Sequence, residues 1–127
     1  MTFGSFDILH KGHEHYLEEA KSYGDYLVVV VARDKNIIRF KGEKPKHDEN
    51  YRLEKVRKLN FVDEAVLGNE DDIFEVLEEY KPDIICLGYD QKAEGLGEEI
   101  KKRGLKIEIK RAKPFKPEIY KSSKLKS

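Results

Sequence analysis

The feature that most constrains the fold is an uninterrupted apolar segment, YLVVVVA, at residues 26–32. Continuous β-branched residues favour an extended strand. The segment shows no alternation of polar and apolar residues, which indicates burial on both faces and is typical of a strand inside a parallel sheet. Such a sheet needs helices on both sides, supplied by the right-handed connections between its strands.

The rest of the chain alternates between strand and helix patterns. Strands are predicted at residues 1–3, 64–67 and 83–87, and the alternating KIEIK at 106–110 predicts a half-exposed edge strand. This order predicts an α/β fold with a five-stranded, mainly parallel sheet in a single domain, residues 1–127. The predicted helices span residues 13–23, 49–59, 71–79 and 96–103. Residues 40–48 are expected to form a polar loop, and residues 112–127 a C-terminal tail.

The charge balance excludes some classes of partner. The 25 basic and 25 acidic side chains give a formal net charge of +0, so no overall field attracts nucleic acid or a membrane. Any anion site must be a local cluster. The sequence contains no signal peptide and no apolar stretch of membrane-spanning length. The single cysteine, Cys86, lies in an apolar run and is predicted to be a buried structural thiol, so we expect a cytoplasmic protein without an internal disulfide.

The residues best placed for chemistry follow the first strand. Ligands of open parallel sheets bind beyond the carboxyl ends of the strands. His10 and His13 lie three residues apart where a helix begins, so their imidazoles can share one face. Gly4 and Gly12 leave room beside the backbone, and the N–H groups of a helix start attract anions. The arrangement suits phosphoryl transfer, because fixed imidazole donors stabilise developing negative charge.

Two other interpretations of the histidine pair remain open at this point. His10 and His13 could bind a metal ion with Asp7 as a third ligand. Alternatively, the pair could cap a helix and satisfy local polar contacts. Two histidines at this spacing do not by themselves distinguish these interpretations from phosphoryl transfer.

The segment GSFDILHKGH at residues 4–13 resembles the GxFDxxHxGH signature of the cytidylyltransferase-like nucleotidylyltransferases. The resemblance implies a Rossmann-like three-layer sandwich and transfer of a nucleoside monophosphate from CTP or ATP to a phosphate-bearing acceptor, with release of pyrophosphate. It implies that His10 and His13 bind the nucleotide phosphates, and that Lys41 and Lys44 lie on a catalytic loop over the triphosphate. It also implies a homodimer, and Mg²⁺ held through the nucleotide phosphates without direct protein ligands.

The resemblance extends to other parts of the chain. Arg52 matches the family arginine that opens the next helix, and the serine pair of the tail matches residues that hold triphosphate. The implied acceptor-binding residues are Asp34 and Tyr89. The implied nucleotide-binding residues are Gly4, Ser5, Phe6, Asp7, His10, Gly12, His13, Arg52, Gly88, Asp90, Gln91, Ser122 and Ser123.

Two groups within this family imply different substrates. Glycerol-3-phosphate cytidylyltransferases carry tryptophan at the position of Gln91, arginine at that of Asn60 and an arginine-bearing lead where this chain has residues 116–121. Archaeal FAD synthases are more similar, sharing the Phe-Asp-Ile-Leu-His, Val-Ala-Arg-Asp, Lys-Gly-x-Lys-Pro and Leu-Gly-x-Asp-Gln segments. This favours AMP transfer from ATP to FMN. A CTP-dependent enzyme and a non-catalytic nucleotide-binding module are the alternatives.

Overall fold

The computed structural model describes residues 1–89, 91 and 95–113. Predictions for Asp90, Ser122, Ser123 and the tail from residue 114 onward lie outside these residues. The elements are β1 (Thr2–Gly4), α1 (Lys11–Ser22), β2 (Val28–Val31), α2 (Asp34–Lys41), α3 (Glu49–Arg57), β3 (Glu64–Leu67), α4 (Glu75–Tyr80), β4 (Ile84–Leu87), α5 (Leu96–Lys102) and β5 (Glu108–Arg111).

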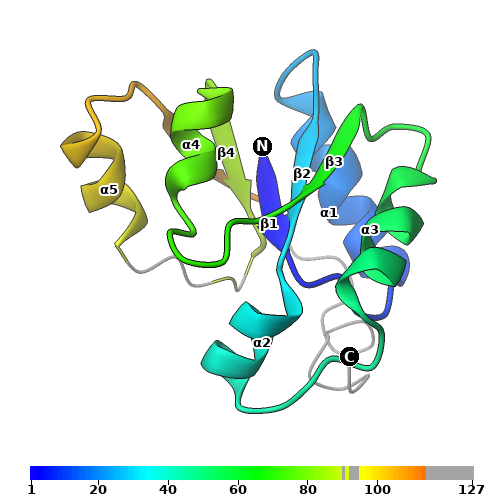
Figure 1. Ribbon diagram of the computed structural model, residues 1–127. Helices are drawn as coiled ribbons and strands as arrows, with labels where there is room; N and C mark the ends of the chain where they lie inside the picture. Colours follow the sequence, from blue (N-terminus) through cyan, green and yellow to red (C-terminus); the bar gives the residue numbers. More distant parts are fainter. Residues whose placement is uncertain (90, 92–94, 114–127) are drawn as a thin grey trace.

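The five strands lie side by side in the order β3-β2-β1-β4-β5 (Figure 1). All three paired ladders, β1–β2, β2–β3 and β4–β5, are parallel. The expected single five-stranded sheet needs one correction, since the strands form a three-stranded and a two-stranded sheet. Strand β1 is only three residues long. The hydrogen bonds that connect it to β4 are made by Met1, the residue before the strand. The Met1 amino group donates to the Ile84 carbonyl at 2.9 Å, and the Cys86 N–H donates to the Met1 carbonyl at 3.0 Å.

The valines of β2 explain why the sheet is covered on both sides. All four are buried, and alternate ones face opposite layers. Val29 and Val31 belong to one apolar cluster with residues of α1 and α3, whereas Val28 and Val30 belong to a second with residues of α4 and α5. Two helical layers therefore enclose the strands, which confirms the predicted three-layer sandwich.

Helix α2 corrects the sequence-based prediction, which placed no helix between the second strand and the loop at 40–48. The helix begins at Asp34, where a carboxylate favours the helix start, and it ends before Gly42, which adopts a left-handed φ of 80°. It lies beyond the carboxyl ends of the strands, at the bottom of the view in Figure 1. Its buried residues are Asn36 and Ile37.

Helix α4 is shorter than predicted. It begins at Glu75, four residues later than expected from the acidic pair at 71–72. The Asp72 carboxylate accepts a hydrogen bond from the Phe74 N–H at 3.0 Å. This local bond offers the backbone an alternative to the helical ladder and explains the late start.

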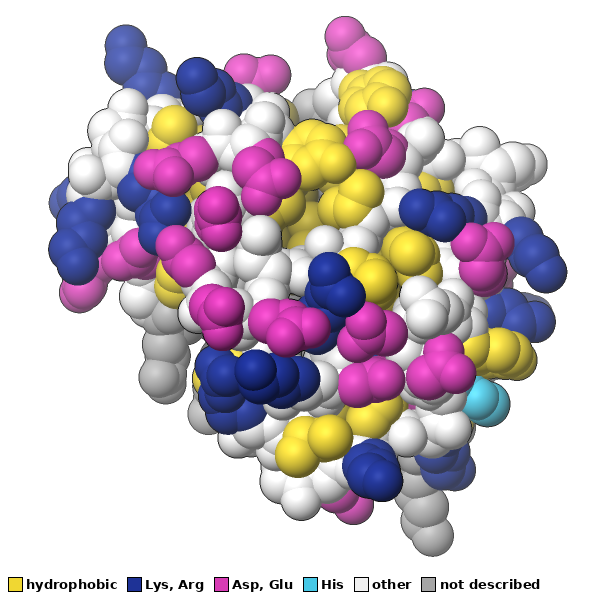
Figure 2. All heavy atoms as spheres, in the orientation of Figure 1, with side chains coloured by type: hydrophobic (Ala, Val, Ile, Leu, Met, Phe, Trp, Pro, Cys, Tyr) yellow, Lys and Arg dark blue, Asp and Glu magenta, His cyan; other side chains and the backbone are white. Residues whose placement is uncertain are grey.

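Cys86 and the surface agree with the sequence-based expectations. The Cys86 side chain is buried, and its burial raises the thiol pKa to about 11, so the thiol stays protonated, as expected of a structural cysteine. Acidic and basic side chains are interspersed on the face shown in Figure 2, as the balanced composition suggests. Among the described residues, no helix is both long enough and apolar enough to cross a membrane.

Candidate active site

A cavity of about 660 Å³ opens at the carboxyl ends of the strands. The connections leave β1 in one direction toward β2 and β3, while β4 and β5 lie on its other side, so the strand order reverses between β1 and β4. Open parallel sheets bind ligands at such a switch point, and the volume is typical of small-molecule sites. The predicted site residues that line the cavity are Gly4, Ser5, Phe6, His10, Gly12, His13, Lys41, Gly88, Tyr89 and Gln91.

His10 forms the N-cap of helix α1. Its Nδ1 accepts a hydrogen bond from the Gly12 N–H at 3.0 Å. Because Nδ1 acts as an acceptor, the neutral ring carries its proton on Nε2. The capping interpretation is therefore correct, and it is compatible with a chemical role: the cap fixes which nitrogen of His10 can donate to a ligand.

His13 stacks on His10. Their ring centroids are 3.9 Å apart, and the planes are inclined by 28°. Burial lowers the pKa of His13 to about 4, and the neighbouring charges of His10 and Lys41 act in the same direction. Burial lowers the pKa of His10 as well. Both pKa values lie below the ordinary histidine value, so near neutral pH the rings are uncharged and can stack without repulsion.

The Phe6 ring packs against the His13 ring of this pair. Its backbone has a φ of 52°, a left-handed conformation that is costly for a bulky residue and is often found at functional sites. The buried Phe6 ring meets the His13 ring edge-on, with centroids 5.6 Å apart. A Cβ atom on Gly4 would lie 2.7 Å from Cζ of Phe6, so glycine at position 4 leaves room for the ring in this position.

Asp7 holds the lysine-bearing loop. Its buried carboxylate accepts hydrogen bonds from the N–H groups of Lys46, at 2.7 Å, and His47, at 2.8 Å. Asp7, Lys41 and Lys44 also line a smaller cavity of about 100 Å³ beside the main one. Both Asp7 oxygens are thus engaged by the loop, and Asp7 does not line the main cavity, so its implied contact with the nucleotide stays a prediction. In the described part of the chain, no group of three His, Cys, Asp or Glu side chains is arranged to hold a metal ion, Asp7, His10 and His13 included.

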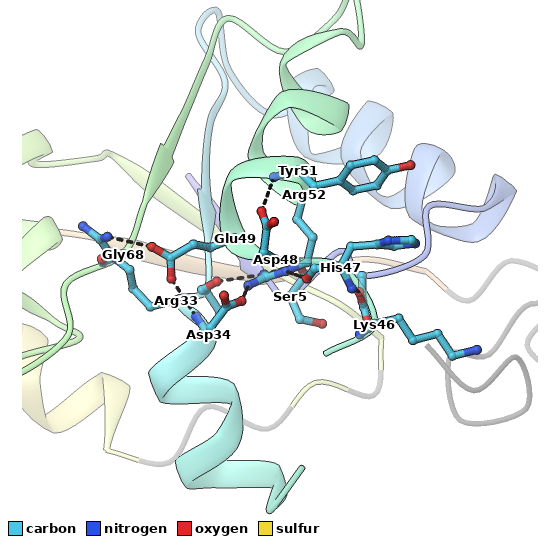
Figure 3. Close-up of polar contacts among 12 residues, drawn as sticks. Ser5, Arg33, Asp34, Lys46, His47, Asp48, Glu49, Tyr51, Arg52 and Gly68 are labelled. Carbon is cyan, nitrogen blue, oxygen red and sulfur yellow. Dashed lines mark hydrogen bonds and ion pairs between the residues drawn. The ribbon is translucent and has the colours of Figure 1, made fainter. Parts of the chain in front are cut away.

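Arg52 connects the walls of the site from inside the protein (Figure 3). Its guanidinium is fully buried and donates to the carbonyls of Ser5, Ala32 and His47 at 2.8–2.9 Å and to the Asp34 carboxylate at 2.6 Å. Neither Arg52 nor Asp34 lines the cavity. The structure therefore corrects the predicted nucleotide contact of Arg52, whose buried guanidinium binds the protein frame. Asp34 is partly exposed and gives one carboxylate oxygen to Arg52, so its contact with the acceptor stays a prediction.

A second set of contacts fixes the start of α2. The Arg33 guanidinium donates to the Glu49 carboxylate at 2.9 Å and to the Gly68 carbonyl at 2.8 Å. The other Glu49 oxygen accepts the Asp34 N–H at 2.9 Å (Figure 3). Arg33 and Glu49 were not among the predicted site residues, since no local sequence pattern links residues that far apart.

The segment after β4 is shaped by Gln91 and Arg111. The Gln91 Oε1 accepts from the Gly88 N–H at 2.9 Å, and its Nε2 donates to the Phe3 carbonyl at 3.2 Å. Arg111, which the sequence analysis also missed, donates to the carbonyls of Gly88 and Gln91, each at 2.8 Å. Gln91 thus lines the cavity and also ties the segment after β4 to β1.

Comparison with known proteins shows the family of the chain. The chain is 54% identical over 110 residues to an FAD synthase of Ferroglobus placidus, covering 85% of this chain and 71% of that protein. It is 48% identical over 125 residues to an FAD synthase of Thermoplasma volcanium, covering 97% and 87% respectively. The crystal structure of a lipopolysaccharide core biosynthesis protein from Thermoplasma volcanium matches with a TM-score of 0.84 and 49% identity, over 90% of this chain and 94% of that one. Residues 1–127 match the profile of one family, so the chain belongs to the cytidylyltransferase-like family.

Proposed function

We propose that the protein transfers AMP from ATP to FMN, forming FAD and pyrophosphate. The observation that carries this proposal is the stacked, uncharged pair of His10 and His13 at the switch point, with Lys41 on the same cavity. The FAD synthase relatives, about half identical over most of the chain, support the choice of substrates.

The chemistry is a direct displacement. An oxygen of the FMN phosphate attacks the α-phosphorus of ATP, a new P–O bond forms, and the bond from the α-phosphorus to the bridging oxygen breaks as pyrophosphate leaves. The FMN phosphate is already ionised near neutral pH, so no protein nucleophile is required. His10 and His13 donate hydrogen bonds to phosphate oxygens, and Lys41 and Lys44 offset their charge. Positioning and charge stabilisation then supply the catalysis.

Mg²⁺ is proposed to enter with ATP. The described residues contain no three-ligand metal group, and both Asp7 oxygens already accept backbone hydrogen bonds. This donor set fits an ion held chiefly by phosphate oxygens and water, as Mg²⁺ often is. When bound, Mg²⁺ would neutralise part of the triphosphate charge.

The nucleotide is proposed to bind on the β4 side of the cavity, along Gly88 and Gln91. Asp90, Ser122 and Ser123, which lie outside the described residues, are proposed to contribute there. A homodimer is proposed from the family resemblance, and light scattering on the purified protein would test it.

Parallel incubations with ATP plus FMN and with CTP plus glycerol 3-phosphate test the reaction. We expect FAD and pyrophosphate in the first mixture and no pyrophosphate in the second. Product in the CTP mixture alone would overturn the proposal in favour of a glycerol-3-phosphate cytidylyltransferase-type enzyme. Tight ATP binding without pyrophosphate release from either mixture would favour a non-catalytic module.

A further inference from the structure

The main cavity has two chemically different parts. One carries the groups suited to phosphates, His10, His13 and Lys41. The other lies between α2 and the connection that follows β3, and none of its lining side chains is charged. We call this second part the α2 compartment; its residues are Asn36, Ile37, Phe40, Gly68, Asn69 and Ile73.

Apolar side chains of the α2 compartment are unusually exposed. The Phe40 side chain lines the cavity yet is 67% exposed, and Ile73 is 37% exposed. Asn36 and Phe40 are four residues apart, so they lie on one face of α2. Exposed apolar surface along a cavity is typical of a ligand site, because the ligand buries it.

Asn36 adds a specific polar requirement. It is 5% exposed, and its Nδ2 donates to the Asn69 carbonyl at 2.9 Å. That bond fixes the orientation of the amide, since a carbonyl can only accept. The Asn36 Oδ1 is buried and has no hydrogen-bond partner among the described residues. Buried acceptors are nearly always paired, so this oxygen calls for an N–H or O–H donor, which a ligand ring can supply.

We propose that the α2 compartment binds the flat heterocyclic ring of the acceptor, with Phe40 and Ile73 against its surface and the Asn36 Oδ1 accepting a ring N–H. This inference rests on the proposed function, in which that ring is the isoalloxazine of FMN. It replaces Asp34 and Tyr89 as the predicted acceptor contacts: Asp34 lies outside the cavity lining, and Tyr89 follows β4.

The order of residues along α2 agrees with the shape of such an acceptor. Lys41 follows Phe40 directly and also lines the cavity, and its charge acts on His13. An acceptor with an uncharged ring at one end and a phosphate at the other can place its ring at Phe40 and its phosphate near Lys41. Strand β1 separates β2, which leads into α2, from β4, so ring and nucleotide occupy opposite sides of the switch point.

Phe40→Ala tests the apolar contact. Because the Phe40 side chain is largely exposed, its removal should leave the fold intact. We expect the KM for FMN to rise about fivefold to tenfold, with kcat and the KM for ATP within about twofold of wild type. Ile38→Ala is the matched control, since Ile38 is an exposed residue of α2 outside the cavity lining, and its KM values should not change. A rise in the KM for ATP instead, or unchanged values, would overturn the inference.

FMN methylated at its ring N–H tests the hydrogen bond to Asn36. The wild-type protein should show about a tenfold higher KM for the methylated acceptor, a comparison that needs no variant. Asn36→Ala should raise the KM for FMN by about as much and should no longer distinguish the two acceptors. Equal KM values in the wild type, or independent and additive effects of the two changes, would refute the contact.

These outcomes separate the inference from the proposed function. If the wild-type protein forms no FAD from ATP and FMN, the proposed function is overturned, and the ring site with it. If the wild type forms FAD but Phe40→Ala and ring methylation leave the KM for FMN unchanged, the function stands and the ring lies elsewhere.

Discussion

The two walls of the cavity are built in different ways. The side chains of residues 4–13 that line the cavity are positioned mainly by contacts within their own segment: the Phe6 ring crosses Gly4, and His10 caps the helix through Gly12 and stacks on His13. Two long-range contacts, from Arg52 to the Ser5 carbonyl and from the loop at residues 46–47 to the Asp7 carboxylate, hold the backbone of the segment. Helix α2 depends instead on partners distant in sequence. The side of the cavity formed by residues 4–13, the catalytic wall, is therefore recognisable as a sequence motif. The side formed by α2, the acceptor wall, takes its shape from contacts between distant segments. The partners of α2 are Glu49, Arg52 and Asn69.

Removing Arg52 should have the largest effect on stability, and it tests the acceptor wall. In Arg52→Met, three carbonyls and the Asp34 carboxylate lose a fully buried partner. We expect the free energy of unfolding to fall by about 3–5 kcal/mol, measured by urea denaturation. Arg57→Ala is the control on the same helix, because its exposed ion pair with Glu54 should contribute less than about 1 kcal/mol. A loss below 1 kcal/mol in Arg52→Met would contradict the structural role of Arg52.

Removing His13 tests the catalytic wall, the side of the cavity formed by residues 4–13. We expect His13→Ala to lower kcat by roughly 10²–10³, the scale of losing one preorganised donor, while FMN still binds in the α2 compartment. Pyrophosphate release at saturating ATP and FMN measures kcat. His15→Ala provides the control, since His15 lies on the same helix but does not line the cavity. An unchanged kcat in His13→Ala would remove His13 from the mechanism.

Gly4→Ala tests how tightly the side chains of the catalytic wall are packed. The added Cβ would lie 2.7 Å from the Phe6 ring, so the ring or the loop must shift. We expect a loss of about 1–3 kcal/mol in the free energy of unfolding. Gly97→Ala should have the opposite sign: Gly97 lies inside α5 with no atom near its Cβ position, and alanine there should stabilise the helix by up to about 1 kcal/mol. Equal stability of Gly4→Ala and the wild type would show that the Phe6 ring is free to move.

The pH dependence of stability should show the most gradual effect, because it is spread over the interval between the folded and unfolded pKa values of His13. The pKa of His13 is about 4 in the folded protein and near 6.5 in the unfolded chain. Between these values only the unfolded chain takes up the proton, so stability falls as the pH drops from about 6.5 to about 4. One such group contributes at most about 1.4 kcal/mol per pH unit. Urea denaturation from pH 7 to pH 4 should give a shallower curve for His13→Gln than for the wild type, whereas parallel curves would contradict the shift.

Much of the fold followed from the sequence because its signals are local. The valine run predicted β2 and the covered sheet, and KIEIK predicted the exposed edge strand β5. Helix α2 was missed, although Asp34 at its start and Gly42 after its end are ordinary helix boundaries. Arg33 and Asp34 directly follow the apolar run of β2, so they were interpreted as the end of a strand and not as the start of a helix.

The sequence predicted some residues of the site correctly and gave no signal for others. The motif residues His10 and His13 lie on the cavity as predicted. Arg52 was identified as important, but its role was not, because a buried arginine and a ligand-binding arginine look the same in one sequence. Asn36 and Phe40 carry no motif; they become candidates only when α2 is placed beside the connection after β3.

The dependence of α2 on distant partners has a consequence for local unfolding. A helix of eight residues is too short to persist in water on its own. Its backbone amides should therefore exchange with solvent hydrogen when the contacts through Arg52 and Glu49 open, so α2 and the start of α3 should exchange as one cooperative unit. A ligand held against Phe40 would slow that exchange in proportion to its occupancy. Hydrogen exchange could thus report acceptor binding in the absence of turnover.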